Sequence, residues 1–354
     1  MQSTGSGRAP VMADVAQAAG VSHQTVSRVL NDHPNVKPAT RDRVLTAIRE
    51  LGYRPNVAAR ALVTRRTRTL GVVSFNTTLY GPASMLYGIE QAAKDLDYFV
   101  AVAALAALDR RSVLDAVDRL RDQAVEGLIV IAPQTSAVNA LSQVRSDLPL
   151  VAVGCGTHAA LSSVAVDNEA GAERATSYLL DLGHRTVHHV AGPRSWLDAQ
   201  EREVGWRRAL AARGAREPEP FIGGDWSSRT GYELGRELAA RVHDEEDPIT
   251  ALFCANDHMA LGLLRAVQAA GLRVPEDLSL IGFDDIPEAE YFGPPLTTIR
   301  QDFDELGRRA LATLIELVDL NAGGGPAPRT APRVTVGPSL VVRASTAPPR
   351  PEAA

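Results

Sequence analysis

The sequence predicts a small all-α helix-turn-helix headpiece followed by an α/β core of two doubly wound parallel-sheet subdomains. Apolar residues recur at helical spacing in short stretches up to residue 51, whereas after residue 68 short apolar runs alternate with amphipathic stretches of helix length. The 354 residues exceed the roughly 250 to 300 at which one hydrophobic core stops growing. Residues 1–68 hold 11 Lys and Arg against 4 Asp and Glu, and the remainder holds 26 against 38. The first segment therefore favours a polyanion as its partner.

The headpiece is predicted to hold three short helices between residues 12 and 51. Gly20 separates the first two helices, Ser22 is placed to cap the second, and Gly52 follows the third. Two helices joined by a tight turn form a helix-turn-helix candidate, although spacing alone predicts a plain helical hairpin equally well. The apolar positions are Val15, Ala16, Ala19, Val26, Val29, Leu30, Val44, Leu45, Ile48 and Leu51.

The second of these helices carries the evidence for DNA binding. Its apolar residues face inward, while Gln24 and Arg28 project outward one turn apart. In the major groove Gln pairs bidentately with adenine and Arg with guanine, and short hydroxyl side chains suit phosphates or base edges. The predicted DNA-contacting residues here are Ser22, His23, Gln24, Thr25, Ser27 and Arg28.

The longer segment predicts parallel sheets covered by helices on both faces, because strands and helices alternate along it. The expected strands are 70–74, 99–103, 128–131, 150–153, 187–191, 251–255 and 278–283. The expected helices are 83–96, 111–123, 169–182, 203–213, 230–241 and 258–270. A dozen or so strands in about 275 residues favour two sheets over one, with a cleft between them as the ligand site.

Composition narrows the function classes. We expect a cytoplasmic protein, since the sequence shows neither a membrane-length apolar run nor a signal-peptide core near its start. Cys155 and Cys254 are predicted to be buried free thiols, and no cofactor or metal is expected. An enzyme is disfavoured because no phosphate-binding loop, G-x-S-x-G or H-E-x-x-H motif occurs. A sugar-binding transport protein would carry a signal peptide and would have no basic headpiece. The sequence differs from it in both respects, so this class is also disfavoured.

Two stretches, ADVAQAAGVSHQTVSRVLN and TRDRVLTAIRELGYRPN, closely resemble the DNA-binding headpiece of the lactose repressor (LacI/GalR) family. The resemblance implies that His23, Gln24 and Arg28 are the principal base readers. Lys37 departs from the serine that often caps the third helix in this family, which predicts a cost to that helix of about 1 kcal/mol. The alternative is that Lys37 contacts a phosphate of the DNA instead.

The segment after residue 55 is predicted to be a conditional helix. Two turns capped by Asn56 are too short to hold in water without a partner. The resemblance implies that this hinge folds on operator DNA, pairs with its dimer mate and inserts Leu62 into the minor groove. The positive charge of Arg60 suits the phosphate backbone. A plain linker with an incidental leucine is the alternative.

Polar residues that follow predicted strands mark the ligand site, because ligands bind beyond the carboxyl ends of parallel strands. These are Asn256 and Asp284, with Arg202 near the start of a helix that follows another strand. Each taken alone is more often a capping or salt-bridge residue, but their joint placement favours a ligand site. The motifs R202xxG205W206, CAND257HMALG262 and GFDD285 again resemble the family, whose core is like that of periplasmic sugar-binding proteins. The resemblance implies an effector site formed by Leu79, Tyr80, Arg202, Trp226, Asn256, Asp284, Gln301 and Phe303.

The combined prediction is a sequence-specific transcription regulator, a homodimeric repressor released from a palindromic double-stranded operator by a sugar inducer. Gly154 and Phe75 depart from the family's sugar-site residues, so a corepressor-dependent regulator that binds a nucleoside or another metabolite stays as the alternative.

The predicted domains are a disordered tail (1–10), the helix-turn-helix domain (11–55), the hinge helix and linker (56–68), the effector-binding core (69–344) and a disordered tail (345–354). Within the core, the first subdomain is expected at about 69–166 plus 300–330, and the second at about 167–297 plus 331–344.

Overall fold

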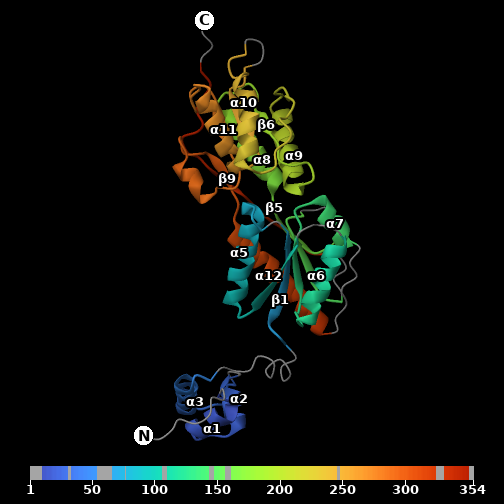
Figure 1. Ribbon diagram of the computed structural model, residues 1–354, viewed down its shortest axis with the longest axis vertical. Helices are drawn as coiled ribbons and strands as arrows, with labels where there is room; N and C mark the ends of the chain where they lie inside the picture. Colours follow the sequence, from blue (N-terminus) through green and yellow to red (C-terminus); the bar gives the residue numbers. More distant parts are fainter. Residues whose placement is uncertain are drawn as a thin grey trace. The chain divides into compact units, whose positions relative to one another are not determined.

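A computed structural model gives the structure of the chain. It describes residues 10–30, 33–53, 66–75, 77–105, 110–142, 147–155, 161–244, 248–323 and 331–350. The chain divides into two compact units, residues 1–67 and residues 68–354 (Figure 1). Most of the predicted hinge and of the predicted amino-terminal tail lies outside the described residues.

The first unit holds the three predicted helices, α1 (Met12–Ala19), α2 (His23–Leu30) and α3 (Pro38–Leu51). Gly20 and Gly52 follow α1 and α3 with φ of 62° and 63°, the left-handed conformation that glycine adopts without strain. The expected apolar residues form its core, although Leu45 and Leu51 are exposed. The buried side chains are Val15, Ala16, Ala19, Val26, Val29, Val44, Ala47 and Tyr53.

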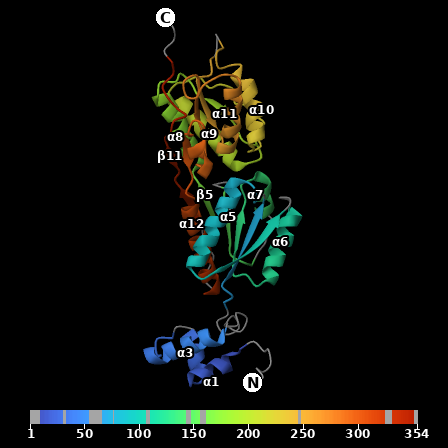
Figure 2. The same ribbon diagram turned by 60° about the vertical axis from the view of Figure 1, so that its left-hand side comes forward.

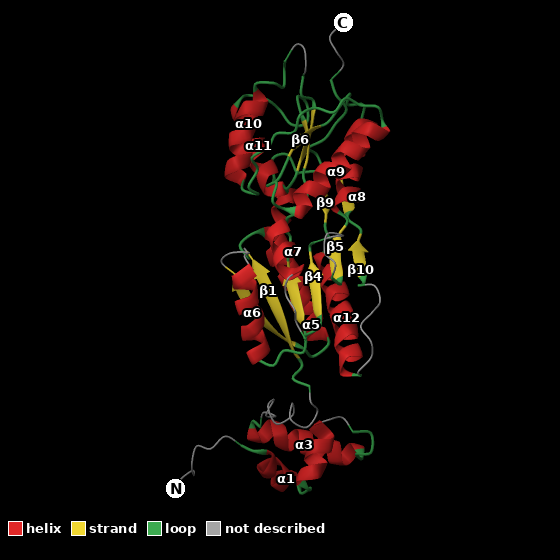
Figure 3. Ribbon diagram, turned by 90° about the vertical axis from the view of Figure 1, so that its right-hand side faces the viewer, coloured by secondary structure: helices red, strands yellow, loops and turns green. Residues whose placement is uncertain are grey.

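The second unit begins with a six-stranded parallel sheet in the order β10-β5-β4-β3-β1-β2. Its strands are β1 (Thr69–Phe75), β2 (Phe99–Leu105), β3 (Leu128–Ile131), β4 (Leu150–Val153), β5 (Ser163–Val166) and β10 (Arg333–Val336). One face packs on α5 (Tyr80–Asp95) and α12 (Phe303–Ala322), and the other packs on α6 (Arg110–Asp122) and α7 (Thr135–Ser142) (Figures 2 and 3). Helices α5 and α12 approach so closely that a Cβ on Gly88 would lie 2.2 Å from the Phe303 carbonyl oxygen.

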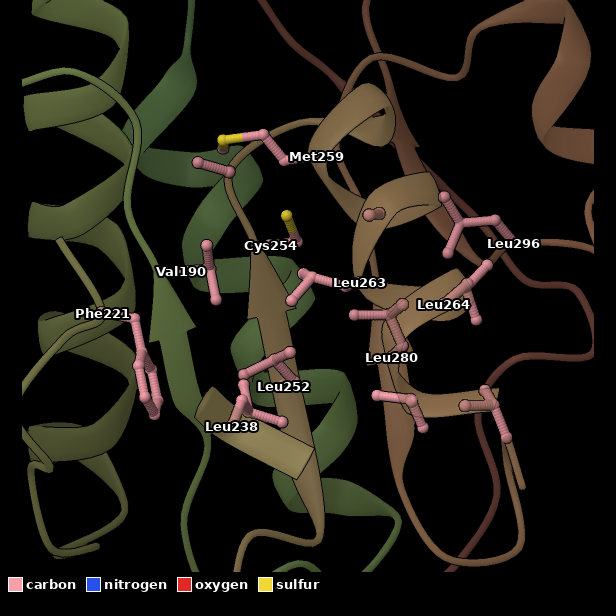
Figure 4. Close-up of a cluster of buried hydrophobic side chains, with 14 of the residues drawn as sticks. Val190, Phe221, Leu238, Leu252, Cys254, Met259, Leu263, Leu264, Leu280 and Leu296 are labelled. Carbon is pink, nitrogen blue, oxygen red and sulfur yellow. The ribbon is translucent and has the colours of Figure 1, made fainter. Parts of the chain in front are cut away.

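A second parallel sheet, β6-β7-β8, lies in the other half of this unit. Its strands are β6 (His188–Val190), β7 (Ala251–Cys254) and β8 (Ser279–Ile281). Single bridges at Phe221 and Thr297 extend it at both edges. The covering helices are α8 (Asn168–Asp181) and α9 (Leu197–Ala212) on one face and α10 (Ser228–Ala239) and α11 (Asp257–Ala269) on the other. Apolar side chains from α10, α11 and the strands interlock in the resulting core (Figure 4).

The two halves of the second unit are discontinuous in sequence. After a 3-10 helix, η2 (Pro287–Tyr291), the chain forms β9 (Thr298–Arg300), which pairs antiparallel with β11 (Ser339–Val341). Between these strands α12 and β10 pack in the first half. The assignment of residues 331–344 to the second subdomain was therefore wrong for β10, which pairs with β5. Its short run, R333-V-T-V, has only two apolar residues and was not among the predicted strands.

The predicted carboxy-terminal tail was also wrong over residues 345–350. Ser345 is fully buried, and its hydroxyl donates to the Leu280 carbonyl oxygen at 2.6 Å. Further along, the Ala347 amide donates to the Ser279 hydroxyl and Arg350 pairs with Asp277 at 2.7 Å. The proline-rich composition indicated disorder, but backbone and side-chain hydrogen bonds fix this segment along the second sheet. No helix among the described residues is long and apolar enough to cross a membrane.

Candidate functional site

Helix α2 presents the predicted DNA-contacting side chains. Val26 and Val29 are buried against α1 and α3, so the helix has one inward face. The side chains of Ser22, His23, Gln24 and Arg28 are exposed, and those of Thr25 and Ser27 are half-buried. Ser22 caps the helix as predicted, because its hydroxyl accepts the Thr25 amide at 3.2 Å and lies 2.9 Å from the Thr25 hydroxyl.

Two further headpiece predictions have different outcomes. Lys37 stands at the N-cap of α3 without a side-chain capping hydrogen bond, and its carbonyl oxygen accepts the amides of Thr40 and Arg41. The predicted hinge contacts Asn56, Arg60 and Leu62 lie outside the described residues.

In the second unit a cavity of about 270 Å³ opens at the carboxyl ends of the strands. This volume is near the lower end of the range for small-molecule sites. Seven of the eight predicted effector residues line it, and Phe303 does not. The lining residues are Thr78, Leu79, Tyr80, Gly81, Pro82, Met85, Trp196, Asp198, Arg202, Trp226, Ser227, Ser228, Asn256, His258, Asp284 and Gln301.

Arg202 is the only arginine or lysine among the lining residues, and it is 3% exposed. Its Nε donates to Asn168 Oδ1 at 2.9 Å and its Nη1 to the Ala255 carbonyl oxygen at 2.5 Å. Its Nη2 lies 3.6 Å from Asp284 Oδ1, and the guanidinium carbon lies 3.7 Å from the centre of the Phe283 ring. These contacts fix the guanidinium in one orientation, because both its fork and its flat face are engaged.

Asp284 faces the guanidinium from the turn after β8. The backbone has φ of 120° there, outside the regions that non-glycine residues ordinarily adopt. Gln301 Nε2 donates to Asp284 Oδ1 at 2.6 Å. The pKa of Asp284 is raised to about 7, chiefly by burial; Arg202 opposes the rise, the nearby Asp198 adds to it, and the Gln301 hydrogen bond opposes it. The adjacent Asp285 pairs instead with Arg300 and Arg343, so the two neighbouring carboxylates have separate partners.

Asn256 and Trp226 are coupled to each other. Asn256 caps α11, since its Oδ1 accepts the Met259 amide at 2.9 Å, and its Nδ2 donates to the Trp226 carbonyl oxygen at 3.1 Å. That bond helps to hold Trp226 at φ of 73°, which is rare for a bulky residue. The Trp226 ring packs edge-to-face on Trp196, with centroids 5.6 Å apart. Asn256 therefore has the capping role as well as a place in the cavity wall.

The first half of the unit contributes the opposite wall, as predicted for Leu79 and Tyr80. Leu79 precedes α5 and Tyr80 is its first residue. Burial raises the pKa of the Tyr80 phenol to about 12. Phe303 is buried in the first core and contacts the Tyr80 ring edge-on, with centroids 5.9 Å apart, so it supports the wall from behind.

Sequence reasoning missed Trp196, Asp198 and His258, which also line the cavity. The reason for the first two is the start of α9, which begins at Leu197 rather than at the predicted Glu203. With the correct start, Asp198 precedes Arg202 by four residues and lies on the same helix face. Among the described residues no group of three or more His, Cys, Asp or Glu side chains is placed to hold a metal ion.

Two family models match the chain. Residues 11–56 match bacterial regulatory proteins of the lacI family, and residues 176–346 match a periplasmic binding protein-like domain. The lactose operon repressor of Escherichia coli strain K12 is 34% identical over 305 residues, which cover 86% of this chain and 83% of that protein.

Solved structures agree over nearly the whole chain. A lac repressor dimer bound to operator and the anti-inducer ONPF matches with a TM-score of 0.79 and 32% identity, covering 96% of this chain and 100% of that one. A complex of the transcriptional regulator CelR with cellobiose matches with a TM-score of 0.67 and 32% identity, covering 95% and 99%. With its headpiece, its core and its relatives in agreement, the chain belongs to the lacI family of bacterial regulatory proteins and is a DNA-binding transcription regulator.

Proposed function

We propose that this chain is a cytoplasmic repressor that binds a palindromic operator as a homodimer and is released by a sugar. The observation that carries the proposal is the convergence of Arg202, Trp226, Asn256 and Asp284, from four separate segments, on one cavity. Together they offer donors, acceptors and an apolar ring face, the set that binds a hydroxyl-bearing ring. The chain acts by binding, without catalysis and without a cofactor.

The exposed face of α2 supports the DNA-binding half of the proposal. Gln24 and Arg28 stand exposed on a helix whose other face is fixed by the headpiece core. Such a helix enters the major groove with its polar side chains toward the base edges. The lac repressor structure that resembles this chain is a dimer bound to operator, and a two-fold dimer matches a palindromic site.

The coupling between the two sites is reciprocal. An inducer that weakens operator binding must bind the DNA-free protein more tightly by the same factor. A corepressor would reverse this sign. The CelR–cellobiose complex favours a sugar as the ligand class for this cavity.

The test is a fluorescence anisotropy titration of the full chain at fixed moderate salt. A palindromic duplex from the protein's own upstream region is compared with a scrambled duplex, and sugars are then added singly. We expect selective binding that one sugar reverses. Equal affinity for both duplexes contradicts the proposal, and selective binding that a ligand only strengthens identifies a corepressor-dependent regulator instead.

A further inference from the structure

The cavity holds more negative charge than the family resemblance assigned to it. Asp198 and Asp284 both line it, whereas Arg202 is the one lining guanidinium. That guanidinium is already bound by Asn168, the Ala255 carbonyl oxygen and Asp284. A ligand therefore meets an excess of carboxylate.

The carboxyl group of Asp198 accepts only a weak hydrogen bond among the described residues. Its described hydrogen bond is from Asn168 Nδ2, at 3.4 Å, and that same amide nitrogen lies 3.1 Å from Glu201 Oε2. Glu201 is one turn further along α9, so a second carboxyl group stands behind the first. Burial is the main reason that the pKa of Asp198 rises to about 6 and that of Glu201 to about 7. Hydrogen-bond donors from a ligand would satisfy the acceptor capacity that Asn168 leaves open.

The rings beside Asp198 add a complementary signal. Trp226 is 8% exposed, and its indole N–H has no hydrogen-bond acceptor among the described residues. A buried donor without an acceptor is costly, and a ligand oxygen that reached this N–H would remove that cost. Carboxylate acceptors, an indole donor and the apolar Trp196 and Trp226 rings together suit hydroxyl groups on a compact ring.

We propose that Asp198 determines effector specificity, so that the cavity takes a neutral, hydroxyl-rich sugar and rejects anionic sugars. This inference rests on the proposed function of the cavity as the effector site. Neutral hydroxyls donate to Asp198 and Asp284 without adding charge. A phosphate or carboxylate would stand beside Asp198 and Asp284, so each of these carboxyl groups that is ionised would repel it, and the one lining guanidinium is already engaged.

The first experiment measures binding of matched ligands to the full chain by isothermal titration calorimetry. Neutral probes are cellobiose, lactose, ribose and glucose, and anionic probes are glucose 6-phosphate and gluconate. We expect at least one neutral probe to bind and both anions to bind about 100-fold more weakly or not at all, because like-charge juxtaposition costs several kcal/mol. An anion that binds as tightly as the best neutral probe, or no binding of any neutral probe, overturns the inference.

The second experiment tests the residue. Asp198→Asn keeps the shape and removes the charge, so the preference for the neutral sugar over glucose 6-phosphate should fall about 10-fold or more, equivalent to about 1.4 kcal/mol. Glu203→Gln is the matched control, because Glu203 lies on the same helix but pairs with Arg207 outside the cavity. Asp198→Ser is the second variant if Asp198→Asn unfolds. An unchanged preference in a folded variant, or an equal change in the Glu203 control, overturns the assignment.

Operator binding separates the two proposals. A wild-type chain that distinguishes the palindromic duplex but binds an anionic sugar keeps the proposed function and loses the role of Asp198. A chain that selects neutral sugars without distinguishing the duplexes loses the proposed function and keeps that role.

Discussion

The side chains of His23, Gln24 and Arg28 stand exposed on α2, a helix anchored by a core of eight buried residues. In the cavity, by contrast, Arg202, Asp284 and Gln301 are buried, and Asp284 contacts the other two. Arg28 is exposed, but Arg202 is 3% exposed and held by three polar partners. An exposed arginine such as Arg28 contributes binding free energy only when DNA supplies its partner. A buried arginine such as Arg202 also contributes to the stability of the free protein. Substitutions should therefore damage DNA recognition without damaging the fold in the first region, and damage both ligand binding and stability in the second.

The largest effect should come from Arg202→Ala. Removing the guanidinium leaves Asp284 buried without its cation, so the free energy of unfolding of the core should fall by about 3–5 kcal/mol. Intrinsic fluorescence in a urea titration measures this selectively, because all three tryptophans, Trp196, Trp206 and Trp226, belong to the second unit. Arg207→Ala is the control, since Arg207 is an exposed partner of surface carboxylates and should cost less than about 1 kcal/mol. Equal losses in both variants would contradict the buried network.

The pH dependence of stability should change in Asp284→Asn. Because the pKa of Asp284 is raised to about 7 in the folded protein, its stabilising contribution is complete below its ordinary value near 4 and is lost as pH rises through 7. Across that window the wild type should lose stability relative to Asp284→Asn by about 1.4 kcal/mol per pH unit. Urea titrations of both proteins at several pH values give this difference. Parallel stability profiles from pH 4 to 8 would show that Asp284 titrates normally.

Arg28→Ala should alter DNA recognition only. Discrimination between palindromic and scrambled duplexes should fall by about 1–3 kcal/mol, the worth of a bidentate base contact, while the urea midpoint of the core stays constant. Arg49→Ala on α3 removes the same charge and should leave the discrimination ratio intact. Full discrimination by the Arg28 variant would remove α2 from the recognition role.

The smallest effect concerns the cap of α3. Lys37→Ser should stabilise this helix by about 1 kcal/mol, because a serine hydroxyl accepts an amide at the N-cap and the lysine side chain makes no such bond. Amide hydrogen exchange of α3 in the full chain measures the change, with Lys37→Ala as the control. The idea fails if serine and alanine protect α3 equally.

Periodic apolar patterns predicted the fold well where elements were long or fully buried. Strands 128–131 and 150–153 match β3 and β4 to the residue, because every side chain in them is apolar. The short strands β5, β9, β10 and β11 were missed, since each contains a Ser, Thr or Arg residue and so lacks the continuous apolar run that marked β3 and β4. Helix α12 was also not predicted, although it packs on the first sheet.

The site was predictable where a polar residue follows a strand, as for Asn256 and Asp284. Trp226 and Gln301 came only from the resemblance, and Asp198 from neither source. Asp198 lines the cavity because α9 begins at Leu197. The sequence does not indicate this start, since the N-cap residue, Trp196, has no capping side chain. The pairing of Asp285 with Arg300 and Arg343 joins residues far apart in sequence and had no local signal.

The chain crosses between the halves of the second unit at three described places, after β5, after β9 and after β10, whereas residue 67 is a single joint between the two units. Recombination at that joint would transfer the DNA-binding unit as one continuous segment. The ligand-sensing halves cannot be exchanged by one cut, because each contains segments from both sides of α12. New regulators should therefore arise more readily by exchange of the DNA-binding unit than by recombination within the ligand-binding unit. The ligand specificity of the second unit would then change mainly by substitutions in its cavity.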